Sequence, residues 1–273
     1  MKILIAADME GISGVVNWDQ VTPGHAEYAR FRRVMTGDVN AAVRGAFEAG
    51  AEEVTISDGH WASGNILVEE LDSRARLNSG SPSPFSMVQG IEAGIEGILL
   101  IGYHARAGAQ NAILDHTWSS KCVLNLWLNQ ILVGETGLNA AMCGHFDVPV
   151  LMVSGDQTVC AEARELLGSL ETAVVKQASG RMAAECLSLQ AAQELICETA
   201  VRAVRRLLDG AAPQPFRLPE PVQVRIEFAN SEMGDRASLL PGAHRLDGRL
   251  IEFEALDMRA AYTGFRAAVG LAY

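Results

Sequence analysis

Acidic and histidine side chains follow several short apolar runs in this chain. Asp8 and Glu10 lie two residues apart in AADMEGISG, directly after the first run. His60 and His104 follow two later runs, and Glu135 follows a fourth. Carboxylate oxygens and imidazole nitrogens, without thiolates, are ligands that suit Zn²⁺ and also Mn²⁺, Co²⁺ or Fe²⁺. These residue types therefore indicate a metal site, provided that the fold brings the five side chains together.

The apolar runs are the predicted strands of a mainly parallel sheet. They are rich in β-branched residues, end in polar or glycine-containing turns, and cover residues 2–8, 52–60, 97–104, 130–135 and 148–156. Such continuous apolarity is typical of strands that are buried on both faces. Helical patterns separate the runs, as in residues 36–50, where Thr36 can cap the first turn. The alternation predicts an α/β fold with helices on both faces of the sheet, in three layers.

A different pattern begins near residue 170. Residues 188–209 have the spacing of one long amphipathic helix, and Gly210 follows it. Four prolines interrupt residues 211–221, and strand alternation resumes over residues 221–230. We therefore predict an α/β metal-binding catalytic domain over residues 1–170 and a smaller α+β domain over residues 171–273.

The predicted sheet brings the candidate ligands to one place. Carboxyl ends of parallel strands share an edge, where ligands bind. Taken singly, Asp8 and Glu10 are more typical of a solvated turn, each histidine of a ring bonded to backbone, and Glu135 of a helix cap. Together, three carboxylates at one edge would repel one another unless a cation lay among them. Five donors, one of them bridging, could hold two metal ions roughly 3.5 to 4 Å apart, which indicates metal-assisted hydrolysis.

Composition excludes several other classes of function. The net charge is −11, from 33 acidic and 22 basic residues, so nucleic acid is not an expected partner. No stretch is apolar enough for a membrane span or a signal peptide, and we expect a cytoplasmic protein. Five scattered cysteines without a CxxC pair indicate reduced residues rather than a disulfide framework. No GxGxxG motif or P-loop supports nucleotide binding.

Ten motifs along the chain resemble those of the DppA-type D-aminopeptidases, which are zinc-dependent metallopeptidases, some of them described as dipeptide-transport proteins. In order, they are DMEGISG, SDGH, PFSMVQG, GYHARAG, VGETGLNA, DVPVLMVSGD, TAVVKQ, IEFAN, LLPG and DMRAAY. The resemblance spans nearly the whole chain. The segment 108–114 departs from the family pattern, which bears on substrate preference more than on chemistry.

The resemblance implies a role for each candidate residue. It implies two zinc ions per subunit, bridged by Asp8 and bound by the full set Asp8, Glu10, His60, His104 and Glu135. His116 occupies the place of the family's catalytic histidine, although spacing alone would favour a loop residue. The implied function is a zinc-dependent aminopeptidase that hydrolyses short peptides from the N-terminus by a metal-activated water. Dipeptides or amides that contain D-amino acids are the implied substrates, and a homo-oligomer, a decameric ring, is the implied assembly.

Two alternative functions stay open from the residues alone. A metal-dependent phosphatase or phosphotransferase also suits the Asp8 and Glu10 spacing, but His60 and His104 fit it poorly. A non-catalytic dipeptide-binding protein is the other alternative. Several further polar residues have a structural explanation as good as a functional one, namely Asp58, Asn139, Asp156 and Asn230.

Overall fold

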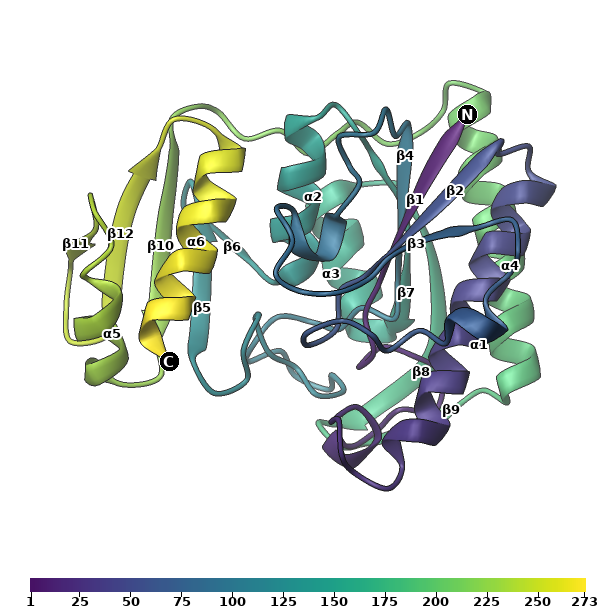
Figure 1. The fold of residues 1–273 in the computed structure, drawn as a ribbon, viewed down its shortest axis with the longest axis horizontal. Helices are drawn as coiled ribbons and strands as arrows, with labels where there is room; N and C mark the ends of the chain where they lie inside the picture. Colours follow the sequence, from purple (N-terminus) through teal and green to yellow (C-terminus); the bar gives the residue numbers. More distant parts are fainter.

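The computed structural model describes residues 1–273, which form two β-sheets side by side along the long axis of the molecule (Figure 1). A seven-stranded sheet has the order β3-β2-β1-β4-β7-β8-β9, and a five-stranded sheet has the order β11-β12-β10-β5-β6. None of the helices combines the length and the apolar character needed to span a bilayer.

The seven-stranded sheet is parallel except for its last pair. Its strands are β1 (Lys2–Ala7), β2 (Glu53–Asp58), β3 (Arg76–Asn78), β4 (Gly97–Ile101), β7 (Val150–Asp156), β8 (Glu171–Gly180) and β9 (Ala183–Cys186). In β1, Ile3 and Ile5 belong to one apolar core, whereas Leu4 and Ala6 belong to another. The sheet is therefore buried on both faces, as its continuous apolar runs predict.

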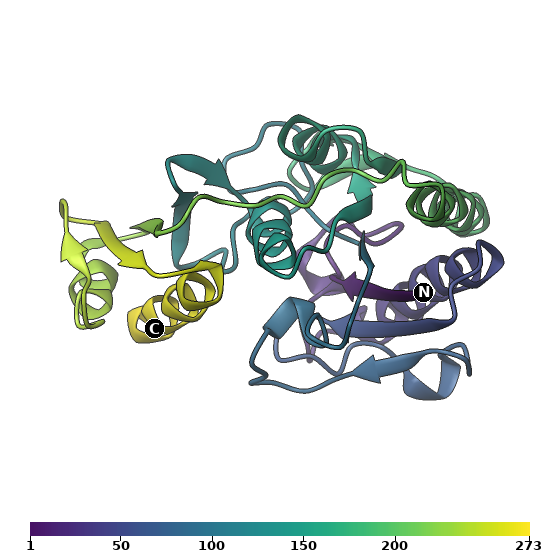
Figure 2. The same cartoon turned by 90° about the horizontal axis from the view of Figure 1, so that it is seen from above.

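Helices cover both faces of this sheet. On one face lie α1 (Tyr28–Glu48) and α4 (Leu189–Leu208), which pack side by side (Figure 2). On the other face lie α2 (Glu135–His145) and α3 (Gln157–Leu167). Three short 3-10 helices lie in the loops, at Trp18–Gln20, Val68–Glu70 and Ser86–Val88. The predicted three-layer α/β architecture is confirmed.

The two predicted helices differ in how well their ends match. Helix α4 begins after Ser188, whose side chain accepts a hydrogen bond from the backbone N–H of Ala191, close to the predicted start. Helix α1 begins at Tyr28, well before the predicted start at residue 36. Thr36 is inside the helix, where its hydroxyl donates to the Arg32 carbonyl. The predicted helix was therefore too short at its N-terminal end. The buried face of α1 already includes Phe31, so the same helical period extends upstream of Thr36.

The five-stranded sheet is antiparallel. It contains β5 (Val123–Leu128), β6 (Ile131–Val133), β10 (Val222–Phe228), β11 (His244–Arg245) and β12 (Leu250–Ala255). Buried and partly exposed residues alternate along β10, because only one of its faces packs on the core. Two helices, α5 (Ser231–Ala237) and α6 (Met258–Ala272), complete this part, and α6 also contacts α2.

The boundary predicted at residue 170 does not coincide with a boundary between the two sheets. β8, β9 and α4 come after that residue, yet they complete the seven-stranded sheet and its outer layer. The β5-β6 hairpin comes before it, yet it pairs with β10 in the five-stranded sheet. Local apolar period predicts a strand but carries no information on which sheet the strand joins.

Candidate active site

Three neighbouring parallel strands deliver Asp8, His60 and His104 to one edge. Asp8 directly follows β1, His60 follows β2, and His104 follows β4, and β1 lies between the other two strands. The shared carboxyl edge predicted for these residues is therefore present.

Two glycines allow the turn that carries Glu10 to lie against the end of β4. The Gly11 N–H donates to the Gly102 carbonyl at 2.8 Å, and a Cβ on Gly11 would lie only 1.9 Å from the Tyr103 carbonyl oxygen. Gly102 has a φ of 76°, and a Cβ there would lie 2.3 Å from the Asp8 carbonyl oxygen. The main chain after β1 can reach this position only because both residues lack a side chain.

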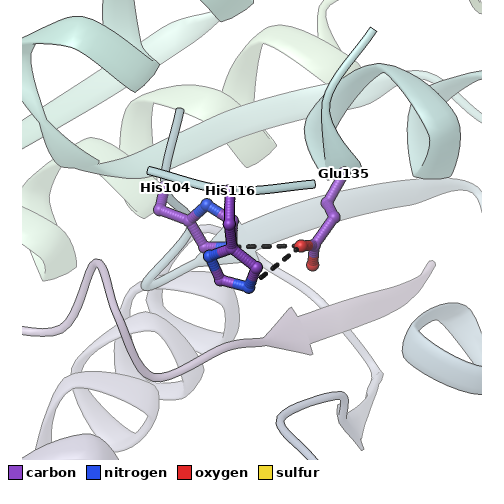
Figure 3. A group of neighbouring side chains, drawn as sticks. All are labelled: His104, His116 and Glu135. Carbon is purple, nitrogen blue, oxygen red and sulfur yellow. Dashed lines mark ion pairs between the residues drawn. The ribbon is translucent and has the colours of Figure 1, made fainter. Parts of the chain in front are cut away.

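Glu135 and His116 reach the same place from other elements. Glu135 is the first residue of α2, after β6 of the antiparallel sheet, so its expected position at the end of a parallel strand is wrong. The Trp118 N–H donates to its Oε1 at 2.8 Å. His116 lies in the loop between β4 and β5, and its ring stacks on that of His104 at 4.0 Å between centroids (Figure 3).

The side chains converge on two faces of Asp8. His60 Nδ1 lies 3.1 Å from Asp8 Oδ1 and 3.1 Å from Glu10 Oε2. His104 Nε2 lies 3.4 Å from Asp8 Oδ2 and 3.2 Å from Glu135 Oε1. Each oxygen of Asp8 therefore faces a different histidine, and each histidine faces a second carboxylate.

His116 joins the cluster at a slightly greater distance. Its Nε2 lies 3.6 Å from Glu135 Oε1 and 3.9 Å from Glu10 Oε1 (Figure 3 shows the Glu135 pair). Ligand atoms converge within 4.8 Å in two sets, one of Asp8, Glu10 and His104 and one of His104, His116 and Glu135. All six predicted site residues are thus brought together, and all six are buried.

The buried cluster contains polar atoms that no protein group satisfies. Asp8 Oδ2, Glu10 Oε2 and His104 Nε2 are buried without a hydrogen-bond partner. Unsatisfied buried carboxylate oxygens cost free energy, and each such atom requires an explanation. Donors of this kind, oxygen and nitrogen without sulfur, fit a divalent cation such as zinc.

Backbone carbonyls orient all three imidazole rings. His60 Nε2 lies 2.7 Å from the Val21 carbonyl oxygen, His104 Nδ1 lies 3.0 Å from that of Ala105, and His116 Nδ1 lies 2.8 Å from that of Leu114. A ring nitrogen that faces a carbonyl carries the proton, which leaves a lone pair on the other nitrogen of a neutral ring. In neutral rings, as metal ligation requires, these lone pairs would point toward the carboxylates, as in metal sites whose histidines are fixed by outer hydrogen bonds.

Electrostatic coupling makes the cluster attractive to positive charge. Burial by itself would raise the pKa of Asp8, but the adjacent imidazoles of His104 and His60 hold that pKa well below its usual range. The pKa of Glu10 is also lowered, against burial and the charge of Asp8, by His60 and His116. Burial would lower the pKa values of His60 and His104, but the carboxylates raise both well above the usual value. A metal cation would compete with protons for these same atoms.

Comparison with known proteins identifies the family. The model of the Peptidase_M55 family, described as D-aminopeptidase, matches residues 1–267. The chain belongs to this D-aminopeptidase family. A D-aminopeptidase of Bacillus subtilis (strain 168) is 39% identical to it over 263 residues, which cover 96% of this chain and 94% of that protein.

A solved structure supports the same family. It is that of the Zn-dependent D-aminopeptidase DppA from Bacillus subtilis, described as a self-compartmentalizing protease. It matches with a TM-score of 0.95 at 38% identity, over 100% of this chain and 98% of that chain. The resemblance inferred from the ten motifs is therefore confirmed, and the family does not favour either alternative function.

Behind the site of this family member, a buried lysine fixes the loop that carries Glu10. Lys176 Nζ donates to the carbonyls of Glu10, Ile12 and Val15 at 2.7, 2.9 and 2.8 Å. Burial lowers the pKa of Lys176 to about 8. Lys176 was not among the predicted site residues. A lone lysine in the apolar strand TAVVKQ is nevertheless a signal, because lysine is almost never fully buried without a partner.

Other supports surround His60 and His116. Asp58 accepts hydrogen bonds from the N–H groups of Asn65 and Ile66 and so shapes the loop after His60, without touching its ring. Arg181 Nε donates to Asp115 Oδ1 at 2.8 Å, which ties the His116 loop to the β8-β9 turn. These residues act through the main chain rather than on the cluster directly.

The remaining weaker candidates have structural roles. Asp156 caps α3 by accepting hydrogen bonds from the N–H groups of Thr158 and Val159, so it has the structural role of a helix cap. Asn230 caps α5 in the same way. Asn139 is buried between the hydroxyls of Tyr103 and Tyr262. The five cysteines are free, and three of them are buried.

A cavity of about 960 Å³ opens onto the cluster. Asp8, Glu10, His60, His116 and Glu135 form one part of its lining. Aromatic side chains and one face of α6 form the rest, with Trp18, Trp61, Phe85, Trp118 and Tyr262 among the aromatic residues. The volume is that of a site for a small molecule or a short peptide.

Proposed function

We propose that the chain is a zinc-dependent aminopeptidase that releases the N-terminal residue of short peptides containing D-amino acids. The observation that carries the proposal is the group of buried atoms without hydrogen-bond partners, Asp8 Oδ2, Glu10 Oε2 and His104 Nε2, in a cluster that a cavity opens onto. Membership of the D-aminopeptidase family and the likeness to a Zn-dependent D-aminopeptidase support the same activity.

The proposed ligands of two zinc ions divide into two sets around Asp8. Oδ1 of Asp8, with His60 and Glu10, makes one set, and Oδ2 of Asp8, with His104 and Glu135, makes the other. Asp8 is the proposed bridge because its two oxygens face different histidines. Zinc held by these donors would polarise the scissile carbonyl and lower the pKa of a water molecule.

His116 is the proposed catalytic histidine. Its Nδ1 is engaged by the Leu114 carbonyl, so Nε2 is the nitrogen available to the cavity. A histidine in this position can accept a proton during attack on the carbonyl and return it to the leaving amine. The carboxylates of the cluster would attract the free α-amine of the substrate, which orients the peptide by its N-terminus.

Assembly and location remain predictions. The description of the DppA relative as self-compartmentalizing supports a homo-oligomer for this chain, and the decameric ring rests on the family resemblance alone. The cytoplasmic location is likewise a prediction from the sequence.

The decisive test combines metal analysis with a stereochemical assay. Purified protein should contain about two zinc ions per chain and should hydrolyse D-Ala-D-Ala faster than L-Ala-L-Ala. A chelator should abolish hydrolysis, and added zinc should restore it. His60→Ala and Glu135→Ala should lose both zinc and turnover, whereas His25→Ala, an exposed histidine outside the cluster, should keep both.

Each alternative has its own signature in the same experiment. Undiminished hydrolysis in the His60→Ala or Glu135→Ala protein would refute the ligand assignment. Hydrolysis of phosphate esters with Mg²⁺, but not of peptides, would indicate a phosphatase. Tight binding of D-Ala-D-Ala without turnover in zinc-loaded protein would indicate a binding protein.

A further inference from the structure

Charge is divided between two parts of the cavity lining. Its three carboxylates, Asp8, Glu10 and Glu135, all belong to the buried cluster. Its three cationic side chains lie outside the cluster, and they are Lys121, Arg259 and Arg266. In a chain with a net charge of −11, three cations in the lining of one cavity, two of them on α6, require a specific explanation.

Arg259 and Arg266 share one face of α6. They are seven residues apart, which places both side chains on the same side of a helix, and both line the cavity. Arg259 lies over the ring of Phe85 at 5.3 Å, and Arg266 lies over the ring of Tyr262 at 5.9 Å. Packing on aromatic faces limits the freedom of both guanidinium groups.

These guanidinium groups have unused donors. Arg266 donates one N–H to the Pro84 carbonyl at 2.8 Å, and a guanidinium has five donors. Neither arginine pairs with a carboxylate of the chain. In the adjoining sheet, by contrast, Arg225 pairs with Glu252 at 2.7 Å and Arg249 pairs with Glu227 at 2.8 Å.

A short series of contacts links Arg266 to the cluster. Trp118 donates its backbone N–H to Glu135 Oε1 at 2.8 Å, and its ring meets that of Tyr262 at 6.0 Å between centroids. Tyr262 in turn lies beneath Arg266 at 5.9 Å. An extended peptide advances about 3.3 to 3.6 Å per residue. A peptide of a few residues can therefore reach from the cluster to Arg266.

We propose that Arg259 and Arg266, assisted by Lys121, bind the C-terminal carboxylate of the peptide substrate. The inference rests on the proposed aminopeptidase function and adds a specificity to it. One end of the cavity receives the α-amine and the scissile bond, and the α6 wall receives the carboxylate through charge-assisted hydrogen bonds. The enzyme therefore selects short peptides with a free carboxylate over the same peptides with an amidated C-terminus.

The test compares one peptide in two forms. In zinc-loaded wild-type protein, kcat/KM should be higher for the tripeptide D-Ala-D-Ala-D-Ala than for the same tripeptide with an amidated C-terminus. Arg266→Gln and Arg259→Gln should each lower kcat/KM for the free acid, mainly through KM, and the double variant should lower it by about tenfold to a hundredfold. Hydrolysis of the amide should stay unchanged in all three variants, and so should zinc content.

A charge-matched control separates local from general effects. Arg205→Gln removes an exposed arginine from α4, outside the cavity lining, and should leave both substrates unaffected. Arg266→Lys keeps the charge without the paired donors and should give an intermediate loss, which also addresses any disruption of the Pro84 contact.

The outcomes distinguish this inference from the function on which it rests. Hydrolysis of neither form by the wild-type protein would contradict the aminopeptidase itself. Equal hydrolysis of acid and amide by wild type, or an equal fall for both in the arginine variants, would overturn only the carboxylate site.

Discussion

The two sheets contribute to the cavity in different ways. The parallel sheet supplies Asp8, His60 and His104 from the ends of strands buried on both faces, and these side chains are 1 to 3% exposed. The antiparallel sheet is buried on one face, and its helix α6 contributes side chains such as Arg259 that are exposed to the cavity. The proposed metal ligands therefore lie on the more buried element, and the proposed contacts to the far end of the substrate lie on the more exposed one.

Metal binding and substrate recognition therefore depend on different parts of the fold. Metal ligands need fixed positions and desolvation, which an edge in the middle of a three-layer fold provides. Recognition of a flexible peptide end needs accessible donors on a separate surface. Changes to the parallel sheet edge should therefore alter metal binding and turnover, whereas changes to α6 should alter substrate preference.

Among changes that should leave zinc in place, the largest expected effect is that of His116→Ala. Without a histidine to transfer a proton, kcat should fall by about 10²- to 10⁴-fold, and zinc content should stay near the wild-type value. Zinc analysis and steady-state kinetics with D-Ala-D-Ala measure both, and His25→Ala is the control for the loss of a histidine. Loss of zinc would instead make His116 a ligand, a role that its convergence with His104 and Glu135 also permits.

Much of the site could be predicted because parallel strands share an edge. Asp8, His60 and His104 each follow an apolar run, and three such runs are β1, β2 and β4 of one sheet. Glu135 was assigned to the same edge for a partly wrong reason, since β6 belongs to the antiparallel sheet and α2 carries the residue to the cluster. The spacing of apolar residues identifies a strand but not its partners.

The rest of the site depends on contacts between distant segments. Arg259 and Arg266 show the spacing of any solvated helix face, and nothing local reveals that this face closes a cavity beside residues 8–10. Lys176 contacts a loop more than 160 positions earlier in the chain. Such pairings arise from the fold as a whole, so the sequence pattern of one segment does not contain them.

The second largest expected effect is a change in the free energy of unfolding. It concerns the buried carboxyl of Asp38, beneath the loop that carries Glu10. Its Oδ2 accepts hydrogen bonds from the N–H and the hydroxyl of Ser13 at 2.9 and 2.8 Å, and its Oδ1 has no partner. Burial raises the pKa of Asp38 from 3.8 to about 6. The folded state therefore holds this proton more tightly than the unfolded chain does.

Because the pKa of Asp38 is raised on folding, the protonated carboxyl stabilises the folded state. The favourable contribution of protonated Asp38 is fully present below about pH 4 and is lost as the pH rises through about 6. Asp38→Asn should therefore gain stability relative to wild type between pH 4 and pH 7, by an amount approaching about 3 kcal/mol. Denaturant unfolding of both zinc-loaded proteins across this range measures it, with the exposed Asp209→Asn as the matched control. A difference that stays constant with pH would mean that Asp38 ionises as freely in the folded protein as in the unfolded chain.

The smallest effect, and the sharpest test of the division, is that of Lys176→Met. Methionine fills a similar volume but cannot donate to the carbonyls of Glu10, Ile12 and Val15, so the loop that positions the Glu10 carboxylate loses its cross-links. Loss of an outer support of this kind should weaken zinc binding by about 10- to 100-fold, measured by competition with a chelator. Lys2→Met, at an exposed lysine on the same sheet, is the control.

The same Lys176→Met protein should keep the wild-type ratio of activity on D-Ala-D-Ala-D-Ala to activity on its amide when zinc is saturating, because α6 is untouched. Lys176→Arg, which keeps donors at this position, should retain more zinc affinity than Lys176→Met and covers the case in which the methionine variant folds poorly. A changed acid-to-amide ratio in either variant would show that the sheet edge and the α6 wall are coupled, so that metal binding and carboxylate recognition are one property of the cavity rather than two.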